Sequence, residues 1–114
     1  MVKLQPDNAS ALNNLGFNRI LQGQYPAAID TLLKAYALNS GDKVIQNNLA
    51  AAYILSGEED MALELFESSL GQAAAFNNIG YIYMIQGNWS AAEKAFTRAM
   101  EISPSYYAKA KKNR

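Results

Sequence analysis

The chain has 114 residues, of which 50% are hydrophobic and 18% are charged, and its formal net charge is zero. This composition is typical of a folded chain rather than a disordered one, and the zero net charge does not suggest a basic nucleic-acid surface. The sequence contains no cysteine and no histidine. Their absence excludes disulfides and thiolate metal sites and removes the commonest general base. No apolar run approaches the length of a membrane span.

Two helices are expected at the start of the chain, over residues 9–22 and 25–38. Apolar residues recur there at helical spacing. Gly23 lies in the turn between the two segments, and Pro26 suits the first turn of the second helix. Gly16 is a poor helix former, so its place in the first helix indicates that another helix packs tightly against it.

A second pair of helices is expected between residues 43 and 72. Its apolar residues again recur at helical spacing, and Gly57 lies in its turn. Gly71 is a natural C-cap for the second of these helices. This unit is four residues shorter than the first, so its last helix is expected to end early.

A third pair of helices is expected from residue 73 to about residue 106. Gly87 lies in its turn, and Asn88 is placed to cap the helix that follows. Residues 105–113 then predict a partial terminal helix. The lysines of that segment favour a polar cap at the end of the fold.

One tetrapeptide recurs in the first helix of every pair. Asn13-Asn14-Leu15-Gly16 returns as Asn47-Asn48-Leu49-Ala50 and again as Asn77-Asn78-Ile79-Gly80. The turn glycines of the three pairs are 34 and 30 residues apart. A near-constant period of this length is typical of stacked-repeat proteins, in which each unit packs only on its neighbours.

The repeated pattern resembles the tetratricopeptide repeat (TPR), which has Leu-Gly and Tyr in its first helix and Ala, an aromatic residue, Ala and Pro after the turn. In the third copy these places hold Ile79-Gly80, Tyr83, Ala92, Phe96, Ala99 and Pro104. In the first copy the matching residues are Leu15-Gly16, Ala28, Leu32 and Ala35. The departures from the pattern are Arg19, Gln46 and Ser69.

The resemblance implies an all-α fold, a right-handed superhelix of three helix hairpins plus a C-terminal capping helix. We expect one domain over residues 1–114, cut from a longer array, with repeats at about 9–42, 43–72 and 73–106 and a partial helix at 105–113. The resemblance also implies a protein–protein interaction module. Such a module is not an enzyme, uses no cofactor, and binds a peptide or helix segment of a partner in its concave groove.

By the geometry of the family, the first helix of each repeat lines that groove. The side chains expected to contact a ligand lie three or four residues apart on each helix: Asn13, Phe17 and Ile20; Asn47, Ala51 and Ile54; Asn77, Tyr81 and Met84. An Asn amide both donates and accepts, so it can pair with the backbone of an extended peptide. The alternative for the aromatic and Met side chains is packing between helices. The second Asn of each tetrapeptide (Asn14, Asn48 and Asn78) is expected to bond between neighbouring repeats instead.

A narrower resemblance, to the TadD type of tight-adherence (Flp) pilus assembly lipoprotein, is carried by the Asn-Asn segments and by Ser103-Pro104-Ser105-Tyr106-Tyr107. It implies a scaffold or assembly factor in the periplasm, associated with the outer membrane; without it a cytoplasmic protein is expected. The alternative function is a self-associating structural solenoid fragment without a peptide ligand, joined through its repeat ends. We expect no nucleic-acid partner and no membrane insertion of this chain.

Several chemical functions are disfavoured by the residues themselves. The acidic residues between Glu58 and Glu67 lack the alternating ligand pattern of a calcium loop, so a solvated helix face is expected. No phosphate-binding loop, metal triad or nucleophile–base pair is present in the sequence. Some chaperone-binding members of the family clamp a partner's terminal carboxylate. That clamp is mostly absent here, because Asn13 and Phe17 stand where it requires charge or a further Asn.

Overall fold

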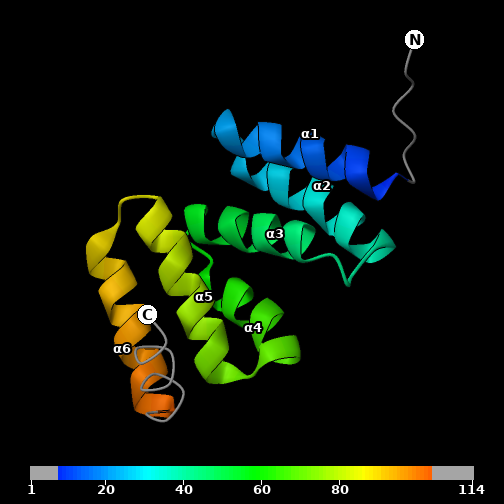
Figure 1. The fold of residues 1–114 in the computed structure, drawn as a ribbon. Coiled ribbons are helices and arrows are strands. Elements are labelled where there is room, and N and C mark those ends of the chain that lie inside the picture. Colours follow the sequence, from blue (N-terminus) through cyan, green and yellow to red (C-terminus); the bar gives the residue numbers. More distant parts are fainter. Residues whose placement is uncertain (1–7, 104–114) are drawn as a thin grey trace. The chain divides into compact units, whose positions relative to one another are not determined.

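A computed structural model describes residues 8–103 of the protein (Figure 1). These residues form six α-helices and no strand: α1 (Ala9–Leu21), α2 (Tyr25–Leu38), α3 (Lys43–Leu55), α4 (Glu59–Leu70), α5 (Gln72–Ile85) and α6 (Trp89–Ile102). The all-α class and the succession of helix pairs predicted from the sequence are confirmed. The predicted capping helix at 105–113 lies outside the described residues.

The helices divide into two compact units, Met1–Ala62 and Leu63–Arg114, with the division falling inside α4. In the first unit, α1 and α2 run antiparallel and pack side by side, and α3 packs against α2 and, over a smaller area, against α1 (Figure 1). In the second unit, α5 and α6 form another antiparallel pair. The single domain, the repeat limits and the hand of a superhelix stay predictions.

Side-chain caps fix where three of the helices begin. The Asn8 Oδ1 atom accepts a hydrogen bond from the backbone N–H of Ala11 at 3.0 Å, at the start of α1. Asp42 caps α3 in the same way, through the N–H of Val44 at 2.9 Å. The predicted cap at Asn88 is confirmed, because its Oδ1 accepts from Ala91 at the start of α6. Each cap satisfies an N–H that the helix leaves without a partner.

Four glycines end helices with a backbone that other residues avoid. Gly23, Gly57, Gly71 and Gly87 have φ values of 78°, 85°, 84° and 80°. Only glycine adopts this left-handed region without a steric cost. The turns predicted at three of these glycines, and the helix end predicted at Gly71, are therefore confirmed.

In each unit, a helical glycine faces a large side chain at close range. A Cβ atom placed on Gly16 would lie 2.5 Å from Cγ of Leu32 on α2. A Cβ atom placed on Gly80 would lie 2.6 Å from Cε1 of Phe96 on α6. Leu32 is fully buried, so the missing Cβ of Gly16 makes room for a core side chain. The close packing predicted at Gly16 is confirmed.

This contact gives a prediction for the substitution Gly16→Ala. In an open helix the change gains about 1 kcal/mol of helix propensity. Here the new methyl group would overlap the branch point of Leu32, and such overpacking typically costs about 1–3 kcal/mol. We expect a net loss of roughly 1 kcal/mol in the free energy of unfolding, measured by urea denaturation.

Gly41→Ala is the matched control, because nothing lies within 4 Å of the Cβ position at Gly41 and its φ is not positive. We expect it to leave stability unchanged or slightly higher. Adding Leu32→Ala to Gly16→Ala should cost less than Leu32→Ala costs in the native chain, since the two changes share one space. A Gly16→Ala variant as stable as the native chain would contradict the close contact.

Candidate functional site

A hydrogen bond between two Asn side chains joins the first helices of two consecutive pairs. Asn48 Nδ2 on α3 donates to Asn13 Oδ1 on α1 at 3.0 Å, in a partly buried position. The expectation that Asn48 bonds between repeats is therefore confirmed. Its partner is Asn13, which was expected to contact a ligand. The Oδ1 atom of Asn13 instead accepts a hydrogen bond that joins α1 to α3. Asn14, the next residue on α1, is exposed.

The predicted ligand face of the first unit is partly apolar and partly polar. Phe17 is 45% exposed and, one turn further along α1, Leu21 is 69% exposed. Asn47 is exposed on α3, whereas Ile20 and Ala51 are half-buried. Ile54 is only 6% exposed, so it offers little surface to a ligand. Exposed apolar side chains on α1 and an exposed amide on α3 thus belong to the predicted ligand face.

On the second unit, α5 carries the corresponding residues. Tyr81 is half-exposed, and its ring packs edge-on against Phe96 of α6 with the ring centroids 5.4 Å apart. This contact holds the ring in one orientation, in the geometry that aromatic pairs prefer. Asn77 and Met84 are half-buried. Ile85, at the end of α5, is 83% exposed.

Leu21 and Ile85 have the largest exposed fractions among the large apolar side chains of these helices. The sequence places both on the exposed side of the predicted ligand face, although they are not among the nine predicted contact residues. They hold equivalent places at the end of the first helix of their pairs, just before the turn glycine. That repeated apolar residue beside a turn was the signal in the sequence. Periodicity alone assigned both residues to a helix face without showing how far they stand from the core.

Arg19 occupies the place where the repeat pattern has Tyr, and the structure gives its role. Its Nη1 atom donates a hydrogen bond to Oγ1 of Thr31 on α2 at 2.9 Å. The Thr31 hydroxyl in turn donates to the carbonyl of Ala27 at 2.9 Å. Thr31 is a buried polar residue in the α1–α2 interface. The guanidinium is therefore directed towards α2 and stabilises a buried hydroxyl.

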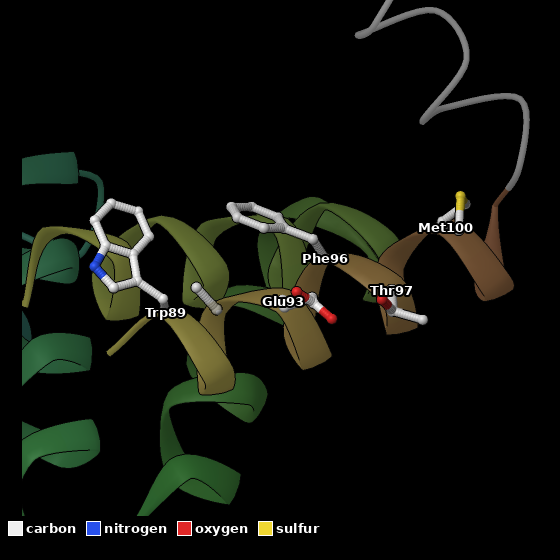
Figure 2. A pocket seen from close by; sticks show the side chains of 6 residues that line it. Trp89, Glu93, Phe96, Thr97 and Met100 are labelled. Carbon is white, nitrogen blue, oxygen red and sulfur yellow. The ribbon is translucent and has the colours of Figure 1, made fainter. Parts of the chain in front are cut away.

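A separate hollow of about 370 Å³ lies along one side of α6 (Figure 2). It is lined by Trp89, Ala92, Glu93, Phe96, Thr97 and Met100. Trp89 is 66% exposed and Met100 is 37% exposed, whereas Phe96 is half-buried. Figure 2 shows that the labelled side chains share one side of the helix. The spacing of these residues on α6 gives a helix face without showing whether another helix covers it.

Other kinds of site have no support in the part of the chain that the structure describes. Over residues 8–103, no three carboxylate, His or Cys side chains lie close enough to hold a metal ion. None of the described helices is long and apolar enough to span a bilayer. The acidic turn from Gly57 to Met61 lines another open hollow, of about 400 Å³. The exposed faces of α1 and α3 in the first unit remain the candidate site, and the exposed face of α5 is a separate candidate on the second unit.

The Asn13–Asn48 bond predicts a specific pattern of stabilities. Asn48→Ala removes the donor and leaves a partly buried acceptor, which costs about 1 kcal/mol. Asn14→Ala is the control, since Asn14 is exposed and gains the same helix propensity from the change. We expect the Asn48→Ala and Asn13→Ala variants to unfold at lower urea concentration than the Asn14→Ala variant. The Asn13→Ala/Asn48→Ala double variant should lose less than the sum of the two single losses; strict additivity would show that the bond contributes nothing.

Comparisons with known proteins agree with this architecture. Models of the tetratricopeptide repeat match residues 7–72 and residues 73–106. The chain is 28% identical over 104 residues to BBSome complex member BBS4 of Bos taurus, a match that covers 89% of this chain and 20% of that protein. It is 29% identical over 87 residues to small glutamine-rich tetratricopeptide repeat-containing protein 2 of Mycosarcoma maydis, covering 71% of this chain and 24% of that protein.

The chain spans about a fifth to a quarter of the length of these relatives. Two matched segments, from residue 7 to residue 106, cover most of the sequence. Their boundary falls directly after Gln72, the first residue of α5, so it coincides with the start of that helix to within one residue. The chain belongs to the tetratricopeptide repeat family, whose repeats are protein–protein interaction modules.

Proposed function

We propose that this chain is a scaffold that holds a segment of a partner protein on the exposed faces of α1 and α3. The observation that carries the proposal is the exposure of large apolar side chains on α1, above all Phe17 and Leu21. On the second unit, α5 offers a similar face of its own, on which Tyr81 is exposed. A folded chain buries most side chains of this kind, and a group of them at the surface typically marks a binding site.

Recognition on this surface requires no chemical step. The peptide backbone of a bound segment offers N–H and C=O groups, and the exposed amide of Asn47 can pair with either. Apolar side chains of the segment would be removed from water against Phe17 and Leu21, which supplies most of the binding free energy. This mechanism accounts for a surface that combines amides with apolar groups.

The wider role of the module rests on fewer observations than the binding surface does. One relative is named as a member of the BBSome complex, which supports a scaffold within a multi-protein assembly. The narrower role, an assembly factor for a tight-adherence pilus, rests on the sequence resemblance of the Asn-Asn segments. It stays a prediction, as does the absence of an enzymatic activity.

The binding surface is tested by the double variant Phe17→Ala/Asn47→Ala. Both side chains are exposed, so the change should leave the unfolding transition nearly intact and reduce recovery of a bound partner at least about tenfold, a loss of roughly 1.4 kcal/mol. The measurement is a quantitative pull-down from an extract of the source organism. Asn13 is left unchanged, because its loss would also break the bond to Asn48.

Leu33→Ala/Asn39→Ala is the matched control, which removes an exposed Leu on α2 and an exposed Asn at the end of that helix. The control should recover the same partners as the native chain. If the Phe17→Ala/Asn47→Ala variant retains every partner of the native chain, the faces of α1 and α3 are not the binding surface and the proposal is wrong.

The hollow on α6 favours a second candidate, a structural solenoid that associates with its own copies. Trp89 and Met100 are exposed there around Phe96, so two copies could bury the same face against each other. The expected result is a mass that rises with protein concentration in sedimentation velocity and falls to the monomer value in a Trp89→Glu variant. Leu33→Glu is the control on α2. A monomer over the whole concentration range would contradict this candidate.

A further inference from the structure

The hollow along α6 contains one acidic side chain in a wall that is otherwise uncharged and mostly apolar. Its lining residues are Trp89, Ala92, Glu93, Phe96, Thr97 and Met100. Glu93 lies between Trp89 and Phe96 along the helix (Figure 2), and its side chain is exposed. A carboxylate in this position has a consequence for whatever covers the hollow, because a charge that loses its hydration needs a countercharge.

Glu93 has no cationic partner in the part of the chain that the structure describes. Among residues 8–103, the ion pair is that of Arg98 with Glu101, at 3.8 Å. The Arg98 guanidinium also lies 5.9 Å from the ring centroid of Phe76 on α5, and Arg98 does not line the hollow. Lys94, the other basic residue of α6, does not line it either. The paired helix α5 carries no ionised side chain, so a countercharge has to come from the ligand.

The groups around the Glu93 carboxylate suit a Lys or Arg side chain. Aromatic rings attract an ammonium or guanidinium group that lies over them, and the indole of Trp does so most strongly. Lys and Arg also have apolar stems, which can lie against Ala92 and Met100. The hollow of about 370 Å³ thus offers two aromatic rings, an apolar floor and one countercharge.

The spacing of the lining residues favours a helical ligand. Trp89, Glu93, Phe96 and Met100 follow one another at intervals of four, three and four residues, which is the spacing at which one helix packs along another. The polar side chains of the hollow are those of Glu93 and Thr97 alone. An extended segment would lose the hydration of its backbone groups there with few partners, whereas a helix pairs those groups internally.

We infer that the hollow on α6 docks an amphipathic helix of a partner protein, with a Lys or Arg of that helix placed against Glu93 between Trp89 and Phe96. Charge decides in favour of this occupant. Two copies of the chain packed face to face would cover two Glu93 carboxylates, and neither basic residue of α6 lines the face that they would share. All of these residues belong to the second unit, so the inference does not rest on the surface proposed for α1 and α3.

The test uses the full chain and a set of synthetic helical peptides of about 18 residues. Each peptide is rich in Ala and Gln, has Leu at helical spacing along one face, and carries Arg, Gln or Glu in the middle of that face. Trp89 is the single tryptophan of the chain, so its fluorescence reports on the hollow. We expect the Arg peptide to shift the Trp89 emission to shorter wavelength and to bind at least about tenfold more tightly than the Glu peptide, with the Gln peptide between them.

Glu93→Gln removes the charge and keeps the size of the side chain. This variant should reduce the preference for Arg over Glu at least about threefold, and added NaCl should no longer weaken the Arg peptide, because no ion pair is left to screen. Glu101→Gln is the matched control, since Glu101 is an exposed carboxylate on the same helix outside the hollow; it should bind the peptides as the native chain does. Phe96 is left unchanged because it fills the space beside Gly80.

Three results would overturn the inference. Equal affinity for the Arg and Glu peptides, or no binding of either, would show that Glu93 selects no cation. Self-association that becomes stronger in the Glu93→Gln variant, with no peptide bound, would place a second copy in the hollow. A Trp89 emission that moves to longer wavelength when the lysines at 109, 111 and 112 are replaced by Gln would place the chain's own end there. The surface proposed for α1 and α3 would stand or fall separately, through its own variants.

Discussion

The architecture depends on the close approach of two helices at a residue without a side chain. Leu32 fills the space beside Gly16, and Phe96 fills the space beside Gly80. At the equivalent place in the middle pair the chain has Ala50, which is fully buried. Because the first helix of a pair uses this narrow side to pack on the second, its opposite side is left outside the hairpin. That geometry leaves part of each first helix exposed to solvent.

The two Asn side chains of the repeated Asn-Asn segment point in different directions and have different roles. Successive residues of a helix point about 100° apart, so two adjacent amides cannot serve the same surface. The bond from Asn48 to Asn13 joins the second Asn of one copy to the first Asn of the preceding copy. The helices α1 and α3 therefore approach each other with different sides of their Asn-Asn segments, the Asn13 side of α1 and the Asn48 side of α3. Asn47 is left on the exposed face as a consequence.

Most of the fold could be predicted from local signals, because each of them acts within a few residues. The turn glycines, the cap at Asn88 and the tight contact at Gly16 are decided by backbone conformation and by the absence of a Cβ atom. The role of Asn13 could not be predicted, since helical periodicity gives a face but not the edge that a neighbouring helix approaches. The exposure of Trp89 could not be predicted for a related reason: the apolar pattern of α6 is the same whether or not another helix covers it.

An apolar binding surface, as proposed for this chain, would depend on shape for its specificity. Charge pairs discriminate between partners over long distances, whereas apolar contacts discriminate only by the size and position of the groups that fit. On the second unit, Tyr81 packs edge-on against Phe96, which fixes the position of its half-exposed ring. Leu21 and Ile85 stand far from the core and can adapt to ligands of different size. Changes at these two positions would then alter the preferred ligand with little effect on the fold, because the contacts that stabilise the hairpins lie on the other side of the same helices.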